Sequence, residues 1–311
     1  MIKVGLIASL YLLIGCSTPP QTLRLIEQPP KNVALTANIQ GVPFYSQQEF
    51  YCGPTTLAEI FEYNGVKKSP ESIAPQLFIP KRKGSLQLEM VAAIRQENFL
   101  AYSSRGSLVQ LIQLINQNIP VIVLQNLGLS WYPLWHYSVV KGYDLASQEF
   151  ILHSADIKNR RVAMKVFERT WQRAKFWFVV ALTPSQNISN LDDFTYISAA
   201  QDLISIGKGP TAIPYLQQAI KIWPENWLSY FLLANYYFEQ SITTGKPFNQ
   251  AIYWFEQGFS FGKNESDYLN NYAYALFKNG DIEQAKIMIK LALILAPADA
   301  NLLATEQEIW L

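Results

Sequence analysis

Cysteine and histidine are scarce in this chain. Its 311 residues include two cysteines and two histidines. A disulfide scaffold needs several cysteine pairs, and a zinc site needs several cysteine or histidine ligands close together. The sequence therefore predicts neither a disulfide framework nor a metal site, and no pattern in it indicates another cofactor.

An excess of charge of one sign is missing as well. Lysine and arginine number 25 against 24 aspartates and glutamates, which gives a formal net charge of +1. No basic cluster extends beyond Lys81-Arg82-Lys83. Because nucleic-acid-binding surfaces are usually strongly basic, the sequence predicts no nucleic-acid partner.

The N-terminal apolar run is too short to span a bilayer. It follows Lys3, extends from Val4 to Gly15 without a charge, and is followed by Cys16. A basic start, a short apolar stretch and small residues before a cleavage site are typical of an export signal rather than of a membrane-spanning helix.

The last four residues of this segment, Leu13-Ile14-Gly15-Cys16, resemble the lipobox of bacterial lipoprotein signals. The resemblance implies that residues 1–15 are removed and that Cys16, lipidated on sulfur, becomes the new N-terminus. Ser17 rather than aspartate follows. In a Gram-negative cell that implies a protein anchored to the periplasmic face of the outer membrane, within the cell envelope. The alternative is an ordinary secretory signal with an incidental cysteine.

Residues 16–38 contain two Pro-Pro pairs and several polar residues. This composition predicts an extended tether without a fold of its own. The remaining chain is long enough for two domains. Half of all residues are apolar and 14% are aromatic, which favours well-packed cores.

Small residues and proline recur at fixed spacing in the C-terminal part. A period of 34 residues with small residues at helix contacts and a closing proline resembles the tetratricopeptide repeat, which stacks antiparallel helix pairs. We therefore predict an all-α domain over 192–311, with three repeats and a capping helix at 301–311. Such repeats usually bind peptides or partner proteins. The recurring positions are Ala212, Ala219 and Pro224, then Ala251 and Gly258, then Ala285, Ala292 and Pro297.

Between tether and repeats, the hydrophobic period changes from helical to alternating. Helical patterns come first and short β-branched or aromatic runs follow, which indicates an α+β domain with an antiparallel sheet over 39–185. The expected helices are 53–64, one starting at Ser69-Pro70, 86–98 and 108–118, and the expected strands are 119–126, 136–144, 149–155 and 176–184.

Cys52 stands where a polar loop becomes a helix, in QQEFYCGPTTLAEIF at 47–61. If Cys16 is lipidated, Cys52 has no disulfide partner in the chain. The positive end of a helix dipole stabilises a thiolate and lowers the pKa of the thiol. This position therefore favours a nucleophile, although a free cysteine can also be a small buried apolar residue.

A nucleophilic thiol needs a base within hydrogen-bond reach, and the chain offers two histidines. His136 begins an expected strand, and the aromatic segment 131–135 before it is suited to forming one wall of a cleft. His153 lies near the end of the next strand and matches no motif. We therefore assign His136 as the base and His153 as a structural residue.

The segment 47–54 (QQEFYCGP), followed by 136–144 (HYSVVKGYD), resembles the bacteriocin-processing, double-glycine-leader cysteine peptidases. The resemblance implies a papain-like fold over roughly residues 40–185. It also implies that Cys52 is the nucleophile, that His136 acts as general base and then acid, and that Gln47 is the oxyanion donor. Gln47 stands five residues before the cysteine, where six is commoner, and Gln48 fits this role less well.

The chain departs from that family at the residue that orients the histidine. The family places an aspartate at the end of the strand after the histidine, and this chain has Ser154 there and Asp156 two residues later. Either of these two side chains or a backbone carbonyl orients His136, or the triad has decayed.

Together these patterns predict a membrane-tethered cysteine peptidase whose repeats recruit a peptide substrate or a protein partner. The alternative is a non-catalytic, peptide-binding scaffold lipoprotein with a degenerate papain-like domain. A third possibility is acyl or amide transfer by the same thiol.

Overall fold

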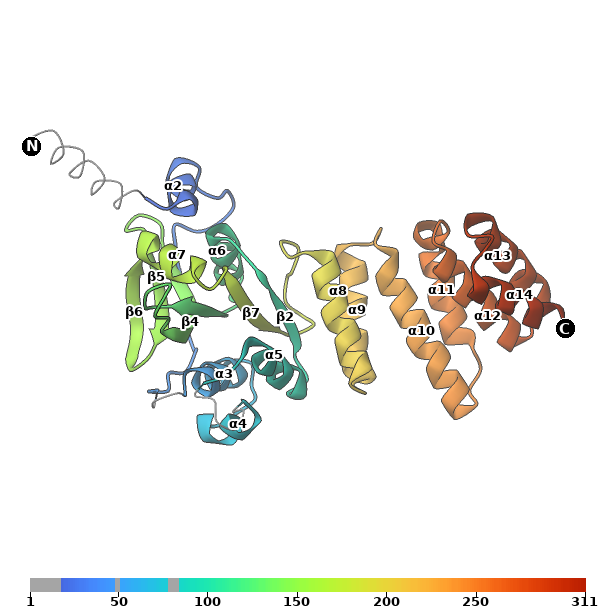
Figure 1. The fold of residues 1–311 in the computed structure, drawn as a ribbon, viewed down its shortest axis with the longest axis horizontal. Coiled ribbons are helices and arrows are strands. Elements are labelled where there is room, and N and C mark those ends of the chain that lie inside the picture. The colour runs from blue at the N-terminus through green and yellow to red at the C-terminus, as the bar shows by residue number, and fades with distance from the viewer. Residues whose placement is uncertain (1–17, 48–50, 78–83) are drawn as a thin grey trace, which may run out of the picture. The chain divides into compact units, whose positions relative to one another are not determined.

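The computed structural model describes residues 18–47, 51–77 and 84–311 (Figure 1). They form two compact units. The first comprises the chain up to Glu97 together with 101–182, and the second comprises 98–100 together with 183–311. The predicted lipidation residue Cys16 and the second glutamine, Gln48, lie outside the described residues.

A seven-stranded sheet forms the centre of the first unit. Its order is β2-β7-β3-β4-β5-β6, and β1 pairs with β4. The pairs β3–β4, β3–β7, β4–β5, β5–β6 and β1–β4 are antiparallel, as the sequence predicts. The strands are β1 Thr36–Asn38, β2 Leu100–Arg105, β3 Val121–Asn126, β4 Trp135–Asp144, β5 Glu149–Ser154, β6 Ile157–Ala163 and β7 Trp177–Leu182.

Helices cover both sides of this sheet. In Figure 1, α3, α4 and α5 lie on one side of it, and α2, α6 and α7 lie on the other. Strand β3 is buried along most of its length, because helices pack on the sheet around it. The bounds are α2 Pro20–Glu27, α3 Cys52–Tyr63, α4 Pro70–Leu77, α5 Gln87–Gln96, α6 Leu108–Asn116 and α7 Met164–Gln172.

The segment expected to be an extended tether is largely folded from Pro20 onward. Helix α2 begins at Pro20, because proline fits the first helical position, where its missing N–H leaves no bond unmade. The backbone N–H groups of Gln21 and Thr22 donate to the Glu168 carboxylate on α7 at 2.9 and 2.6 Å. A carboxylate at a helix N-terminus is stabilising. The tether expectation for this part of 16–38 is therefore wrong.

Helices alone make up most of the second unit. Helix α8 packs on α9, α10 on α11 and α12 on α13, and α14 follows as a single helix. The recurring alanines are fully buried where helices meet. At Gly258 a Cβ atom would lie 2.5 Å from Tyr230, so a larger residue there would need the helices to move apart. The bounds are α8 Asp193–Ser205, α9 Gly209–Ile222, α10 Trp227–Thr244, α11 Asn249–Gly262, α12 Ser266–Asn279, α13 Ile282–Leu295 and α14 Ala300–Trp310.

None of the helices in the described ranges is suited to spanning a membrane. None of them combines the length with the apolar character that crossing a bilayer requires.

Candidate active site

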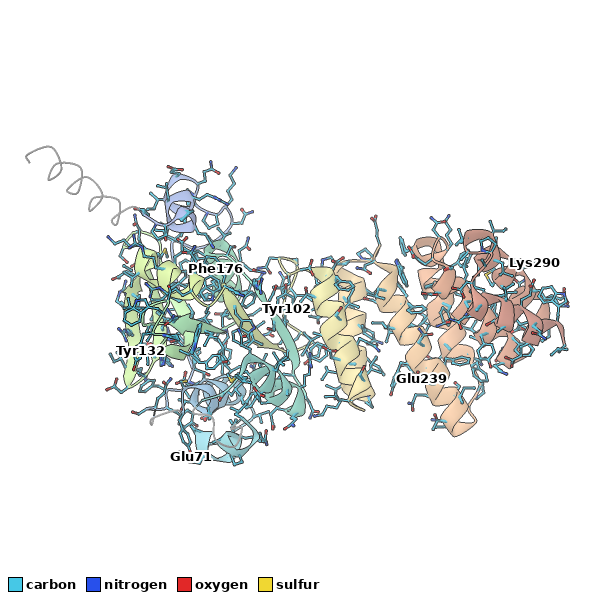
Figure 2. All side chains as sticks on the ribbon, viewed as in Figure 1. Glu71, Tyr102, Tyr132, Phe176, Glu239 and Lys290 are labelled. Carbon is cyan, nitrogen blue, oxygen red and sulfur yellow. The ribbon has the colours of Figure 1, made fainter. Side chains whose placement is uncertain are left out.

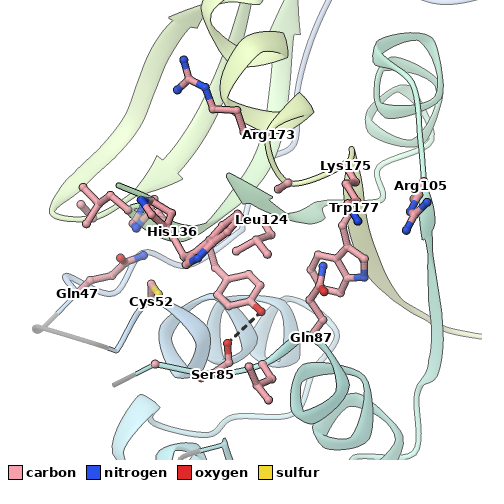
Figure 3. Close-up of a pocket in the computed structure, with 18 residues that line it drawn as sticks. Gln47, Cys52, Ser85, Gln87, Arg105, Leu124, His136, Arg173, Lys175 and Trp177 are labelled. Atoms are coloured by element: carbon pink, nitrogen blue, oxygen red, sulfur yellow. Dashed lines mark hydrogen bonds between the residues drawn. The ribbon is translucent and has the colours of Figure 1, made fainter. Parts of the chain in front are cut away.

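A cleft of about 930 Å³ opens in the first unit (Figure 3). Gln47, Cys52 and His136 all line it, although 84 residues separate the cysteine from the histidine. Figure 3 shows these three side chains gathered at one end of the cleft. The structure therefore brings together the three residues that the sequence predicts for the site.

Cys52 is the first residue of α3, and its thiol is free and half-buried. Burial raises the pKa of this thiol, and hydrogen bonds from backbone N–H groups of Tyr137, Gly53 and Cys52 itself lower it by less. The sequence-based expectation of a lowered thiol pKa is therefore wrong in direction. Desolvation of the sulfur outweighs the favourable field at the start of the helix.

The chain crosses closely over the start of α3. A Cβ atom at Gly53 would lie 2.4 Å from the Ser85 Oγ atom, so only glycine fits here without a shift of residues around Ser85. The carbonyl of Ser85 accepts a hydrogen bond from the Tyr137 hydroxyl at 3.2 Å (Figure 3). Gly53 thus allows the segment around Ser85 to form the side of the cleft next to the thiol.

His136 is the second residue of β4 and pairs with Gln125 on β3. Its Nε2 atom lies 3.0 Å from the Ser154 Oγ atom. Burial, and to a lesser extent the charge of Arg160, lowers the pKa of the imidazole to about 4. The imidazole is therefore neutral at neutral pH and can accept a proton.

The hydrogen bonds continue beyond Ser154 into the sheet. Ser138 Oγ lies 3.2 Å from both Ser154 Oγ and Gln125 Oε1. Ser138 Oγ is placed to donate to either oxygen, and Gln125 Oε1 can only accept. Ser154 Oγ also bonds Nε2 of His136, as acceptor or as donor according to the tautomer of the ring. In the tautomer in which Nε2–H donates to Ser154, Nδ1 of His136 carries no proton and can act as a base.

At its far end the same hydrogen-bond network reaches helix α7. Gln125 Nε2 donates to the Thr170 hydroxyl on α7 at 2.7 Å. Ser154, Ser138 and Gln125 are all at most 5% exposed. A buried polar chain with every member satisfied holds its side chains rigidly. The histidine is therefore oriented by neutral hydroxyl and amide groups.

Asp156 does not take the orienting position, and the backbone explains why. In the pairing of β4 with β5, Val139 lies opposite His153. Continuing this register would bring Asp156 opposite His136. The strand instead ends at Ser154, and Ala155 adopts a left-handed φ of 57° that turns the chain into β6. Of the open alternatives, the structure selects Ser154.

His153 is fully buried away from the cleft. Its Nδ1 atom lies 3.1 Å from Glu59 Oε2 and 3.1 Å from the carbonyl oxygen of Pro43. Glu59 also accepts from the backbone N–H of Tyr45 at 3.2 Å. Burial raises the pKa of Glu59, and the His153 contact opposes this. The pair links α3 to β5. The only sign of this contact in the sequence is a glutamate within a largely apolar helix.

The last three residues of the aromatic segment before His136, 133–135, form a wall of the cleft, as predicted for this segment. Asn126 Oδ1 accepts from the backbone N–H groups of Gly128 and Leu134, both at 2.9 Å, and this fixes the loop. Trp135 lines the cleft and is half-exposed. Tyr132 is 73% exposed and projects at the outer edge of the first unit (Figure 2).

Gln47 lies beside the turn that follows β5. Its backbone N–H donates to the carbonyl of Ala155 at 3.3 Å, in the turn that follows Ser154. Its side chain is half-buried and faces the cleft beside Cys52 (Figure 3). An amide in this position can donate to an oxygen that gains charge near the sulfur.

The residues of the site do not form a set of metal ligands. In the parts of the chain that the structure describes, no three histidine, cysteine, aspartate or glutamate side chains gather as ligands of an ion. The chemistry available at this cleft is that of a thiol, a neutral imidazole and an amide.

Residues 39–177 match the Peptidase_C39 like family. The match spans Cys52, His136 and Ser154, and covers less than half of the chain. It identifies a cysteine peptidase-like domain in this part of the protein. No curated protein matches the chain.

Solved structures resemble each half of the chain. A Bacillus anthracis protein described as a C39-like peptidase is 15% identical, with a TM-score of 0.41, over 48% of this chain and 98% of that one. The peptidase domain of Streptococcus ComA, an ABC transporter, is 23% identical, with a TM-score of 0.39, over 46% and 99%. The second TPR domain of human RPAP3, solved with an HSP70 peptide, is 16% identical, with a TM-score of 0.36, over 40% and 99%.

Proposed function

We propose that residues 39–185 form a papain-like cysteine peptidase domain that hydrolyses peptide bonds. The observation that carries this proposal is the meeting of Cys52, His136 and Gln47 at one end of a cleft, with Ser154 holding the far nitrogen of the imidazole. The family match over 39–177 supports it. A cysteine, a base and an oxyanion donor are the groups that acyl transfer through a thiol requires.

In the first half of the reaction, the Cys52 proton passes to Nδ1 of His136 as sulfur attacks the peptide carbonyl carbon. The Gln47 amide and the backbone N–H of Cys52 stabilise the oxyanion. His136 then gives the proton to the leaving amine, and the C–N bond breaks to leave a thioester on Cys52. Since the thiol pKa is raised and the imidazole pKa is lowered, we place this proton transfer within the attack itself.

In the second half, His136 takes a proton from water and the hydroxide attacks the thioester. The oxyanion occupies the same site beside Gln47. When the C–S bond breaks, the proton returns from His136 to the sulfur of Cys52. The mechanism uses the tautomer in which Nε2–H of His136 donates to Ser154, and this contact keeps Nδ1 directed at the reacting atoms.

Cleavage of a peptide mixture tests this proposal. The purified full chain is incubated with a mixture of unrelated decapeptides, and the products are identified by mass spectrometry. We expect new amino and carboxyl termini from the intact chain and none from its Cys52→Ala variant. Binding of the peptides without any cleavage would instead support the non-catalytic scaffold, which the raised thiol pKa and the missing carboxylate favour. Products joined to an added amine would indicate acyl transfer.

Alkylation gives a pH-dependent prediction for the thiol. Because burial raises the Cys52 pKa, less thiolate is present at pH 7 than for an exposed cysteine, whose pKa is about 8.5. We expect iodoacetamide to label Cys52 more slowly at pH 7 than a model thiol, and the rate still to rise above pH 9. Peptide mapping after timed labelling measures this. A rate plateau between pH 5 and 7 would reveal a preformed ion pair and contradict the prediction.

We further propose that lipidation of Cys16 anchors the chain to the periplasmic face of the outer membrane. Support comes from Leu13-Ile14-Gly15-Cys16 in the sequence. Metabolic labelling with an alkyne fatty acid, compared between the intact chain and Cys16→Ala, tests it. Equal labelling of both would reject the anchor.

The helical pairs α8–α13, which we interpret as tetratricopeptide repeats capped by α14, would recruit the polypeptide substrate or a partner protein. The recurrence of small residues at helix contacts supports the interpretation as repeats. Photo-crosslinking of the peptide mixture to the full chain should mark 192–311 as well as the cleft. Crosslinks confined to the cleft would contradict this role.

A further inference from the structure

The end of the cleft away from Cys52 is positively charged. Arg105 and Lys175 line this end and are exposed, Arg173 lines the cleft on the side of His136, and no aspartate or glutamate is among the described residues that line the cleft (Figure 3). Figure 3 shows Arg105 and Lys175 beside Trp177, across the cleft from Cys52. Because nearby carboxylates would neutralise these cations, their absence leaves a local excess of positive charge.

The three cations have different roles. Arg173 donates to the backbone carbonyls of Asn126 and Gly128 at 3.2 and 2.7 Å. It therefore secures the loop that carries the aromatic wall. Arg105 and Lys175 take part in none of the ion pairs found among the described residues. Their charges are available to a ligand.

The turn that carries Lys175 is held in an unusual conformation. Lys175 and Phe176 both have left-handed φ angles, 55° and 57°, although neither is glycine. Such a conformation is unfavourable for a residue with a side chain and persists only where surrounding contacts enforce it. The backbone N–H groups of these two residues donate to the carbonyls of Gln172 and Trp171 at 2.8 and 3.1 Å.

The same turn is joined to the end of β2, where Arg105 lies. The backbone N–H of Gly106 donates to the carbonyl of Phe176 at 2.9 Å. A Cβ atom at Gly106 would lie 2.8 Å from the Phe178 ring, so glycine is what permits this close approach. One backbone bond therefore fixes Arg105 next to the turn of Lys175, and neither cation depends on a flexible loop for its position.

We propose that Arg105 and Lys175 form a subsite that binds a carboxylate of the peptide substrate. The proposal rests on the peptidase function and adds a substrate class to it: peptides with an acidic group a few residues from the scissile bond. Arg105 offers a planar fork of donors that matches a carboxylate, and Lys175 adds a second charge. Trp177, half-buried between them and the site, packs against the apolar part of the bound chain.

Two kinds of carboxylate fit this chemistry. A glutamate or aspartate side chain would make the enzyme an endopeptidase with an acidic preference. A C-terminal carboxylate would make it trim a fixed number of residues from chain ends. One charge pair at an exposed site changes affinity by up to about five-fold, so two pairs together are expected to give about three- to ten-fold, and the effect weakens with salt.

Binding of matched peptides to the full chain with Cys52→Ala tests the proposal without hydrolysis. The probes are fluorescein-labelled decapeptides, blocked at the C-terminus by an amide, with one glutamate or one glutamine moved through all positions. A third set carries glutamine and a free C-terminal carboxylate. Fluorescence anisotropy gives Kd at 50 and 500 mM salt. We expect three- to ten-fold tighter binding of the glutamate peptide at one position, or of the free C-terminus, with the difference reduced at high salt.

Substitutions then assign the effect to the two cations. In Arg105→Gln with Lys175→Gln the preference for the charged peptide is expected to disappear, while glutamine peptides bind as before. Lys165→Gln is the matched control, because Lys165 is an exposed cation on α7 that does not line the cleft. Thermal unfolding confirms that each variant is folded. If the double variant does not fold, the single variants Arg105→Gln and Lys175→Gln are measured instead.

The outcomes separate this subsite from the peptidase function. Equal Kd values for glutamate, glutamine and free-terminus peptides would overturn the subsite, even if the intact chain cleaves them. A preference that survives in Arg105→Gln with Lys175→Gln, or that Lys165→Gln also removes, would overturn it too. A preference that depends on Arg105 and Lys175 would establish it, even if the intact chain cleaves no peptide and the peptidase proposal fails.

Discussion

Alanine in place of Cys52 or of His136 is expected to lower kcat/KM for peptide hydrolysis by at least about 10³-fold, and both together are expected to lower it little further. Only Cys52 can form the thioester, and only His136 can accept the proton that the thiol loses. Each step of the reaction needs both groups, so removing the second after the first leaves little more to lose.

The measurement is the hydrolysis rate of the best peptide from the mixture, for the intact chain, the two single variants and the double variant. Gln47→Ala is a graded comparison, since loss of one oxyanion donor typically costs about 10²–10³-fold in rate. Ser103→Ala, a substitution on β2 outside the cleft lining, should leave the rate unchanged. Independent, multiplicative losses at Cys52 and His136 would argue against a shared catalytic step.

The positions of Cys52 and His136 could be predicted because local patterns fix them. A polar loop, a Gly-Pro step and an apolar helical face locate the start of α3 at Cys52. An alternating β-branched run locates β4, with His136 near its start. Their meeting at one cleft depends on long-range packing, and only the resemblance of the two segments to one family pointed to it.

The electrostatics of the site could not be predicted in the same way. A sequence shows that a cysteine begins a helix, but it does not show how deeply the sulfur is buried. Here Ser85 and Tyr137 close over the start of α3, and burial raises the thiol pKa. The dipole effect at an exposed helix end is only about 0.3–1 kcal/mol, which partial desolvation readily exceeds.

The orienting residue and the cationic end of the cleft depend on turns that pattern reasoning missed. The left-handed residue Ala155 ends β5 and selects Ser154 over Asp156. Strand β2, with Arg105 at its end, was not expected from the sequence. The turn at Lys175 was not expected either, because no glycine or proline stands within it. In both places a non-glycine residue with positive φ decides the geometry.

Helix α2 illustrates a different limit. A Pro-Pro pair within polar sequence fits an extended chain and a helix start equally well. What decides between them is Glu168, almost 150 residues away in the sequence, whose carboxylate accepts from both Gln21 and Thr22. Local composition contains no trace of that contact.

Ser154→Asp is expected to convert the neutral pair into one in which the imidazole readily becomes charged. A carboxylate bonded to Nε2 favours the protonated imidazole, so the His136 pKa should rise from about 4 by roughly one to three units. The charged imidazole in turn stabilises the Cys52 thiolate and lowers the thiol pKa. We expect iodoacetamide labelling of Cys52 at pH 7 to accelerate at least about ten-fold, and hydrolysis to rise with it.

The histidine titration, followed by NMR of the ring carbon protons, and the labelling rate together measure this change. Ser154→Ala is the matched control, because it removes the acceptor without adding charge. It should slow hydrolysis, since His136 loses its orienting partner, and it should leave the His136 pKa low, since burial is the main cause of the shift. If Ser154→Asp and Ser154→Ala gave the same titration midpoint and labelling rate, Ser154 would be a packing residue only. A rise confined to Ser154→Asp would show that a charge at position 154 acts directly on the imidazole, which places this residue in contact with His136.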